Sequence, residues 1–291
     1  MRIRGLIVLI MKIIVESGAT KSDWRVLGPD GRELKRFLRA GTNVSSMKME
    51  DIKATLAEAI SSEGLAGASG LYLYTAGVVT PGISAELTGF LRGVSDIGEI
   101  DIQDDLMGAA RGVCGHEPGI VAILGTGSST CFYDGVTVER KVYSGGYVIG
   151  DEGSGSALGK LFLSDFIKGL VPEDLAADFS REFDSSYAGI VEGVYRSASP
   201  SGYLGSIAPF VVGHYSHPYA KELIERNFQA FIERSLLRYD VAAYPVGIVG
   251  GFAFACRDIL TPLFAAAGIR ASRFIKAPID GLCEYHSARQ G

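Results

Sequence analysis

Three short turns rich in glycine and hydroxyl residues follow apolar segments of this 291-residue chain. They are Ser17-Gly18-Ala19-Thr20, Gly125-Thr126-Gly127-Ser128 and Gly250-Gly251. Glycine lets the backbone approach a ligand closely, and Ser or Thr hydroxyls with free N–H groups can hold phosphate oxygens. Tight hairpins use the same residues, so any one of these turns could be purely structural.

Neither of the common phosphate-binding motifs accompanies these turns. The chain has no Gly-Lys-Ser/Thr sequence of a Walker A loop and no G-x-G-x-x-G segment that opens a helix. Gly125-Thr126-Gly127 lies between two expected strands instead. This placement favours a phosphate clamp built on a β-hairpin, the arrangement that actin-like ATPases use.

Two acidic residues at strand ends could take part in phosphoryl transfer. That reaction needs positioning, charge stabilisation and a carboxylate that accepts the proton of the acceptor hydroxyl. Asp105 lies just beyond an expected strand, but either it or Asp104 could simply cap the helix that follows. Glu16 could orient a water bound to magnesium, or it could be a solvated strand end.

Histidine and cysteine give no signal of a metal site or a disulfide framework. His214 and His217 have a metal-like spacing without a third ligand nearby, and we expect a loop between helices there. The cysteines are far apart and form no C-x-x-C pair, so we expect reduced, mostly buried thiols. They are Cys114, Cys131, Cys256 and Cys283.

Strands and helices alternate along the first half of the chain, which is the pattern of an α/β lobe. We expect strands at 13–16, 24–27, 34–39, 71–74 and 100–102, and helices at 49–63, 83–94 and 106–113. The order of strand, glycine turn and strand begins again at 120–124 and 130–133. This repetition indicates a duplicated fold with a cleft between two lobes.

Helices dominate the remainder of the chain. We expect an amphipathic helix at 220–239, a strand at 246–249, a helix at 252–264 and a closing helix at 281–289. The expected lobes are 11–113 and 114–291, with the closing helix able to pack back on the first lobe. Lys12 interrupts the N-terminal apolar run and no small-residue cleavage site follows, which argues against a secretory signal. Residues 1–10 are expected to be an N-terminal extension, because Met11 opens a plausible first strand.

Composition limits the classes of function. Hydrophobic residues make up 47% and charged residues 21% of the chain, as in globular proteins. The net charge of -5 and the scattered Lys and Arg residues disfavour nucleic-acid binding. The apolar run near the N-terminus is too short to span a bilayer, so we expect a cytoplasmic protein without a membrane partner.

Taken in order, the motifs resemble those of the N-acetylglucosamine kinase family, within the broader group of benzoyl-CoA reductase and hydroxyacyl-CoA dehydratase activator ATPases. The resemblance covers nearly the whole chain. It implies duplicated ribonuclease-H-like lobes of the actin-like ATPase fold. The matching residues are Glu16-Ser-Gly-Ala-Thr-Lys-Ser22, Gly41-Thr-Asn43, Asp105, Gly125-Thr-Gly-Ser128, Gly145-Gly146, Gly150-Asp-Glu-Gly-Ser154 and Gly250-Gly251.

The resemblance also implies a role for each matching residue. The ATP contacts would be Gly18, Thr20, Lys21, Thr126, Gly127, Gly250 and Gly251, with Mg²⁺ accompanying the nucleotide. The acceptor sugar would contact Asn43, Asp105, Ser128, Ser129, Gly146 and Asp151. Asp105 would be the catalytic base and the protein a homodimer. The alternative for 150–154 is a loop before a helix, with Ser154 as the helix cap.

One departure from the family bears on the choice of sugar. A tryptophan usually precedes the Gly-Asp-Glu-Gly stretch, whereas Tyr147 follows Gly146 here in a shorter loop. Glucosamine or another hexose or hexosamine is therefore an alternative acceptor. An activator ATPase is a further alternative, although no cysteine pair suits its iron–sulfur cluster. A sugar-sensing regulator is disfavoured, because the N-terminal extension is too short for a DNA-binding helix-turn-helix.

Overall fold

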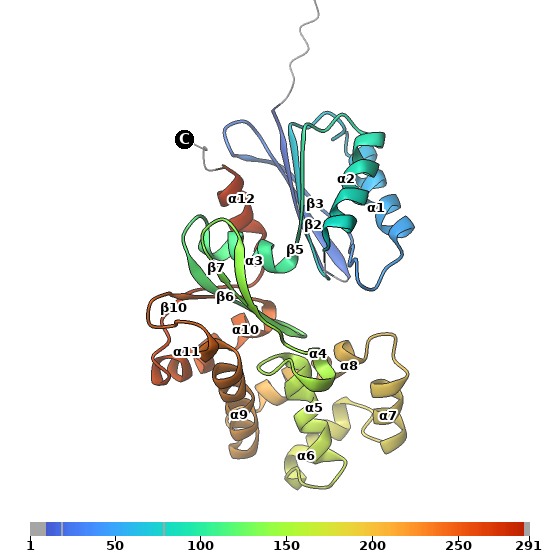
Figure 1. Cartoon of the computed structure of the whole chain (residues 1–291). Coiled ribbons are helices and arrows are strands. Elements are labelled where there is room, and N and C mark those ends of the chain that lie inside the picture. The colour runs from blue at the N-terminus through green and yellow to red at the C-terminus, as the bar shows by residue number, and fades with distance from the viewer. Residues whose placement is uncertain (1–9, 19, 78, 288–291) are drawn as a thin grey trace, which may run out of the picture. The chain divides into compact units, whose positions relative to one another are not determined.

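The chain is described by a computed structural model that covers residues 10–18, 20–77 and 79–287 (Figure 1). One unit contains the described residues up to Glu117 together with those from Pro278 onward, and the second contains Pro118–Ala277. The lobe boundary expected after residue 113 stays a prediction. The expectations for residues 1–9, 19 and 288–289 lie outside the described residues.

The first unit contains a five-stranded sheet in the order β3-β2-β1-β4-β5. Its strands are β1 (Lys12–Ser17), β2 (Lys21–Leu27), β3 (Glu33–Ala40), β4 (Gly70–Thr75) and β5 (Glu99–Asp104). The first three strands pair antiparallel, and β4 and β5 extend the sheet parallel to β1. The carboxyl ends of three parallel strands therefore meet at one edge, where ligands bind in open α/β sheets.

Alternation of apolar residues places helices on both faces of this sheet. Ile13 and Val15 pack with α1 (Met49–Ser62) and α2 (Pro81–Val94) on one face. Ile14 points to the other face and packs with α12 (Ile279–Ser287). Successive strand residues face opposite sides, and each fully buried aliphatic side chain stabilises the fold by about 1.5–3 kcal/mol.

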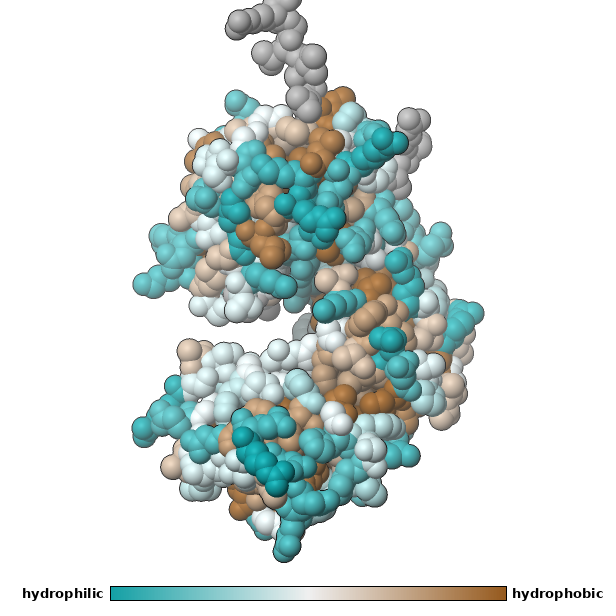
Figure 2. Space-filling model, turned by 180° about the vertical axis from the view of Figure 1, so that it is seen from behind, coloured by the Kyte–Doolittle hydropathy of each residue, from teal (hydrophilic) through white to brown (hydrophobic). Residues whose placement is uncertain are grey.

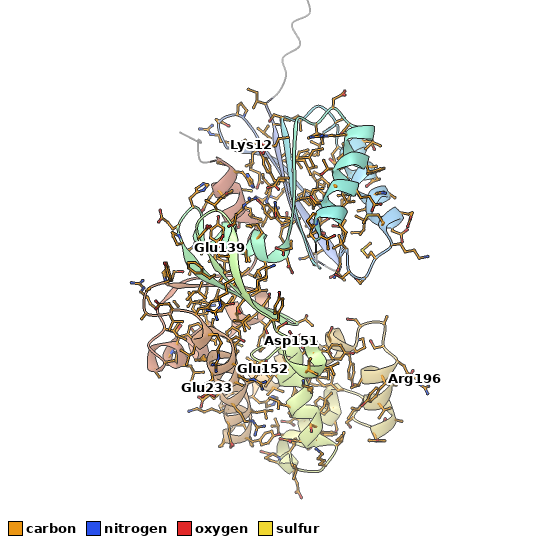
Figure 3. The ribbon with its side chains drawn as sticks, in the orientation of Figure 1. Lys12, Glu139, Asp151, Glu152, Arg196 and Glu233 are labelled. Atoms are coloured by element: carbon orange, nitrogen blue, oxygen red, sulfur yellow. The ribbon has the colours of Figure 1, made fainter. Side chains whose placement is uncertain are left out.

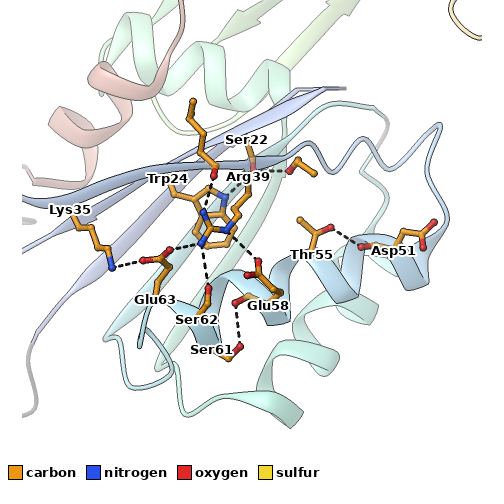
Figure 4. Close-up of polar contacts among 12 residues, drawn as sticks. Ser22, Trp24, Lys35, Arg39, Asp51, Thr55, Glu58, Ser61, Ser62 and Glu63 are labelled. Atoms are coloured by element: carbon orange, nitrogen blue, oxygen red, sulfur yellow. Dashed lines mark hydrogen bonds and ion pairs between the residues drawn. The ribbon is translucent and has the colours of Figure 1, made fainter.

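Polar contacts fix two of these helices to the sheet. Arg39 on β3 forms ion pairs with Glu58 and Glu63 near the end of α1 (Figure 4). On the other face, Nε2 of the buried His286 ring on α12 lies 2.7 Å from the Tyr74 hydroxyl oxygen. Lys12 Nζ donates to the His286 carbonyl oxygen at 2.6 Å, so the closing helix belongs to the first unit.

The second unit repeats the strand topology of the first. Its strands are β6 (Gly119–Leu124), β7 (Ser128–Tyr133), β8 (Val138–Val142), β9 (Val246–Val249) and β10 (Ala271–Ile275). They form a sheet in the order β10-β9-β6-β7-β8, with β6, β7 and β8 antiparallel and β9 and β10 parallel to β6. The duplicated α/β fold expected from the sequence is thereby confirmed.

Most helices of the second unit lie between β8 and β9. They are α4 (Gly146–Ile149), α5 (Gly155–Phe166), α6 (Glu173–Glu182), α7 (Tyr187–Tyr195), α8 (Pro200–Gly213), α9 (Pro218–Arg234) and the 3-10 turn η1 (Leu236–Arg238). A large apolar core joins α5, α8 and α9 to the sheet. His214 and His217 lie in the loop between α8 and α9, as expected.

Two helices differ from the sequence expectation. The helix expected at 220–239 ends at Arg234, and η1 then turns the chain so that the Tyr239 hydroxyl accepts from Val142 N–H at 2.7 Å. The helix expected at 252–264 is two helices, α10 (Gly251–Ala255) and α11 (Arg257–Ala266). The chain leaves helical geometry at Cys256, whose N–H bonds the carbonyls of both Phe252 and Ala253.

Hydrophilic and hydrophobic residues are interspersed on the face seen in Figure 2. Among the described helices, none is both long and apolar enough to cross a membrane.

Candidate active site

A buried hydroxyl network shapes the carboxyl edge of the sheet in the first unit. Ser17 ends β1, and its Oγ accepts from both the N–H and the hydroxyl of Thr42 at 2.8 Å. Thr75 ends β4 and donates to the Thr42 carbonyl at 2.6 Å. The network therefore holds the loop at 41–43 against two neighbouring strand ends, which positions Asn43.

Asn43 sits on this loop in a fixed orientation. Its Oδ1 accepts from Ser45 N–H at 2.9 Å, which directs the amide group of the side chain. Gly77 packs against the same loop with φ +94, and a Cβ there would lie 2.8 Å from Asn43 Oδ1. Sequence reasoning did not single out Gly77, although a glycine just past a strand end is a signal for close approach.

The structure separates the roles of the adjacent acids Asp104 and Asp105. Asp104 is the N-cap of α3 (Asp105–Cys114), and its Oδ1 accepts from Met107 N–H at 2.8 Å. Asp105 is the first helical residue and is exposed. The helix thus has its cap without Asp105, and Asp105 lies one residue past the carboxyl end of β5.

Glu16 lies near the end of β1 and is half-buried. Burial raises the pKa of its carboxyl group above the ordinary value, and the charge of Asp105 raises that pKa further, while Lys21 opposes both. Gly18 N–H bonds the Lys21 carbonyl at 3.0 Å in the turn between β1 and β2, where Thr20 is exposed.

In the second unit, the hairpin turn between β6 and β7 is fixed to the start of α5. Gly125 N–H bonds the Gly127 carbonyl at 3.0 Å across the turn. The carbonyls of Gly125 and Thr126 accept from Gly155 N–H at 2.9 Å and Ser156 N–H at 3.0 Å. Ser128 and Ser129 follow as the first residues of β7.

Asp151 lies beside this turn and is buried (Figure 3). Its Oδ1 accepts from Ser128 N–H at 3.2 Å, and a Cβ on Gly127 would lie 3.0 Å from its Oδ2. Asp151 has a φ of 60°, which side chains rarely adopt, so the fold holds this residue in a strained conformation. Burial raises the pKa of its carboxyl group, partly offset by hydrogen bonds from the Ser128 backbone and the Ser144 side chain and by the charge of Lys160.

The loop that follows Asp151 has its own supports. Ser154 is the N-cap of α5, and its Oγ accepts from Ala157 N–H at 3.1 Å, so the capping interpretation of Ser154 is confirmed. Asn227 on α9 accepts from Gly153 N–H at 3.0 Å and donates to the Ser154 carbonyl at 3.2 Å. Asn227 was not singled out from the sequence, but a polar residue within the buried stripe of α9 is a signal for such a role.

Gly146 begins α4 and has a φ of 70°. Gly250 has a φ of 129° and crosses β6 closely, since a Cβ there would lie 2.2 Å from the Leu124 carbonyl oxygen. Only glycine tolerates these two backbone positions without strain.

A cavity of about 610 Å³ brings two of the predicted glycine turns together within the second unit. It is lined by Gly125 and Thr126 of the hairpin, by one side of α10, and by the start of α5 and one side of α8. Its lining residues are Gly125, Thr126, Gly155, Gly205, Pro209, Val212, Gly213, Gly251, Phe252, Ala255 and Cys256.

The predicted site residues thus fall into two groups. The first unit carries Glu16, Gly18, Thr20, Lys21, Asn43 and Asp105. The second unit carries Thr126, Gly127, Ser128, Ser129, Gly146, Asp151, Gly250 and Gly251. Their roles in binding and catalysis remain predictions.

Comparison with known proteins supports the family assignment. A solved structure from Porphyromonas gingivalis, a candidate N-acetylglucosamine kinase, is 33% identical, with a TM-score of 0.88 over 97% of this chain and 100% of that chain. An N-acetylmuramic acid/N-acetylglucosamine kinase from Clostridium acetobutylicum is 27% identical over 217 residues, 69% of each protein. No family model matches the chain.

A more distant structure shares the fold alone. The ROK family glucokinase of Streptomyces griseus, solved with glucose and AMPPNP, is 19% identical, with a TM-score of 0.57 over 97% of this chain and 100% of that chain. Together with the duplicated sheets, this likeness establishes the actin-like ATPase fold. The identity and nearly complete mutual coverage with the P. gingivalis protein show that this chain belongs to the N-acetylglucosamine kinase family.

Proposed function

We propose that this protein transfers the γ-phosphoryl group of ATP to the 6-hydroxyl of N-acetylglucosamine. The observation that carries the proposal is the position of Asp105, an exposed carboxylate one residue past β5, in a helix that Asp104 already caps. A base for phosphoryl transfer needs such a carboxylate within reach of an acceptor hydroxyl.

In the proposed reaction, Asp105 accepts the proton of the sugar hydroxyl. The hydroxyl oxygen forms a bond to the γ-phosphorus of ATP, and the bond from that phosphorus to the bridging oxygen breaks. ADP then leaves with the electron pair of the broken bond. The contribution of the protein to this step is positioning and electrostatic stabilisation.

The cavity of the second unit supports the placement of ATP. Thr126 offers a hydroxyl at one end of a cavity whose glycines allow close backbone approach. The proposed ATP contacts are Gly18, Thr20, Lys21, Thr126, Gly127, Gly250 and Gly251.

The carboxyl group of Glu16 is the proposed magnesium contact, through water. The Asp105 charge raises the pKa of Glu16, so both groups act in one electrostatic environment that a cation would relieve. Mg²⁺ prefers oxygen ligands and keeps several waters, which matches a contact from Glu16 through water. When bound with ATP, Mg²⁺ neutralises charge on the transferring phosphoryl group.

Asn43, Ser128, Ser129, Gly146 and Asp151 are the proposed sugar contacts besides Asp105. The fixed amide of Asn43 and the buried carboxylate of Asp151 support this assignment, because rigid polar groups select hydroxyl positions. A sugar hydroxyl would satisfy part of the hydrogen-bonding capacity of Asp151.

N-acetylmuramic acid is a second candidate acceptor, favoured by the position of Lys160. Its ammonium group donates to the Tyr147 carbonyl at 2.8 Å, in the loop that is shorter than in the family. Burial raises the pKa of the Asp151 carboxyl group, and the charge of Lys160 offsets part of that rise. A cation beside the proposed sugar site could pair with the lactyl carboxylate of that sugar.

A coupled assay of ADP release tests the proposal. The panel contains N-acetylglucosamine, N-acetylmuramic acid, glucosamine, N-acetylmannosamine and glucose. We expect N-acetylglucosamine to give the highest kcat/KM. Turnover without stimulation by any of these sugars would refute the kinase proposal and favour an activator ATPase. A homodimeric, cytoplasmic enzyme is part of the same proposal, and light scattering tests the dimer.

A further inference from the structure

The two ends of the cavity in the second unit can be distinguished by the residues along α8. Gly205 of α8 lies at the Thr126 end, because a Cβ on Gly205 would lie 3.2 Å from Thr126 Cγ2. Gly213 lies eight residues further along α8, which corresponds to about 12 Å of helix. If the Thr126 end holds phosphates, the wall at Val212 and Gly213 is the wall that meets the nucleobase.

Among the described residues that line the cavity, only Thr126 and Cys256 carry a side-chain group that can form a hydrogen bond. The wall from α8 presents Pro209, Val212 and Gly213. The wall from α10 presents Phe252 and Ala255, and Cys256 follows it. Burial raises the pKa of the Cys256 thiol to about 12, so this side chain stays neutral and is a weak donor.

Several backbone carbonyls at the end of α8, including that of the lining residue Val212, already have partners. The carbonyls of Val211 and Val212 accept from the N–H groups of His214 at 3.2 Å and Tyr215 at 3.1 Å. The Phe210 carbonyl lies 2.8 Å from Nδ1 of His214. These carbonyls would otherwise be the natural acceptors for an exocyclic amino group, since a helix end leaves its last carbonyls without helical partners.

A backbone acceptor among the described residues of the cavity wall lies nearer the Thr126 end. Pro209 has no N–H group, so the Gly205 carbonyl lacks the usual helical donor four residues later. Both residues line the cavity, and Gly205 lies beside Thr126. This carbonyl therefore suits a ribose hydroxyl, which all ribonucleotides share, and does not distinguish one base from another.

We propose that the protein holds the nucleobase by apolar contact alone and accepts purine nucleoside triphosphates, ATP, GTP and ITP, with similar efficiency. This inference rests on the proposed function, which places the nucleotide in this cavity. A site that hydrogen-bonds its ligand rejects an analogue lacking the matching group by roughly 10⁴-fold, whereas an apolar pocket discriminates by only about 10- to 200-fold. The apolar walls contact the faces of the purine ring, which are similar in ATP and GTP.

Two measurements on the full chain test this inference. The first is kcat/KM for ATP, GTP and ITP at saturating N-acetylglucosamine. The second is calorimetric binding of AMPPNP and its guanine counterpart GMPPNP without sugar. We expect the values within each series to agree within about tenfold, the lower end of the discrimination that an apolar pocket gives.

A preference for adenine above about 200-fold in both measurements would overturn the inference, because it exceeds what apolar contact supplies and requires hydrogen bonds to the base. The calorimetric ratio keeps the inference separate from the proposed function. If no sugar is phosphorylated but both analogues bind equally, the proposed function fails and the base tolerance stands.

Substitution of Phe252 tests whether apolar contact supplies the affinity. We expect Phe252→Leu to weaken AMPPNP and GMPPNP binding by the same factor, about threefold to tenfold, through lost aromatic contact. Phe254→Leu on the same helix is the matched control, since Phe254 does not line the cavity. A change in the ratio of the two affinities in Phe252→Leu, or an equal loss in Phe254→Leu, would contradict the assignment.

Discussion

The adjacent acids at the start of α3 provide a matched pair of substitutions that separates capping from catalysis. Asp104→Ala removes the side chain that accepts from Met107 N–H at 2.8 Å. Asp105→Ala removes the exposed carboxylate one residue later. We predict that the first variant loses more stability and keeps its chemistry, whereas the second loses less stability and loses its chemistry.

The magnitudes follow from the two environments. Loss of an N-cap side chain costs typically about 1 kcal/mol, within a range of about 0.5–2 kcal/mol. In a domain of 150–250 residues, such a loss lowers Tm by about 2–4 °C. Asp105 contributes about 0.3–1 kcal/mol through the helix dipole. Removal of a general base lowers kcat by about 10²- to 10⁴-fold.

The assay pairs thermal unfolding with sugar-dependent ADP release for both variants and for Asp105→Asn, which keeps the shape of the side chain. We expect Asp104→Ala to retain kcat within about tenfold of wild type, far from the loss that removal of a base causes. Near wild-type turnover in Asp105→Ala would refute the assignment of the base. Loss of turnover in Asp104→Ala with unchanged Tm would show that the neighbouring acid is the base.

Three further substitutions test the supports of the site and the closing helix. Gly250→Ala should destabilise the protein by more than about 1 kcal/mol in urea titration, because its Cβ would lie 2.2 Å from the Leu124 carbonyl oxygen. An unchanged free energy of unfolding would contradict this close packing. Asn227→Ala breaks both hydrogen bonds to the loop at 153–154, so we expect about 2 kcal/mol less stability and a higher KM for the sugar. An unchanged KM would show that Asn227 does not support the sugar site. Burial lowers the pKa of His286 from 6.5 to about 3, so its contribution to the free energy of unfolding is present above pH 6.5 and is lost as the pH falls from 6.5 to 3. His286→Gln should flatten that part of the profile of stability against pH, and an unchanged profile would exclude His286 as its cause.

The sequence predicted the repeated α/β pattern because hydrophobic periodicity and glycine turns are local signals. It missed β8 and β10, the edge strands of the second sheet. Residues 138–142 read Val-Glu-Arg-Lys-Val, and their middle residues are exposed. An edge strand buries only part of its surface, so its periodicity resembles that of a polar loop.

The candidate residues of the site were found through glycine and acidic motifs, but their supports were not. Asn227 reaches the loop at 153–154 from more than 70 positions away in the sequence, and only the tertiary fold brings them together. Asp104 and Asp105 were equivalent as caps in the sequence, since either side chain suits the start of a helix. The backbone geometry at the end of β5 distinguished them.

The central claim, transfer of phosphate to a sugar, is tested most directly by identification of the product. The purified protein is incubated with ATP, Mg²⁺ and N-acetylglucosamine, and the product is analysed by ³¹P NMR and mass spectrometry. We predict N-acetylglucosamine 6-phosphate in equal amount to the ADP formed. ADP formation with inorganic phosphate and without a phosphorylated sugar would contradict the claim.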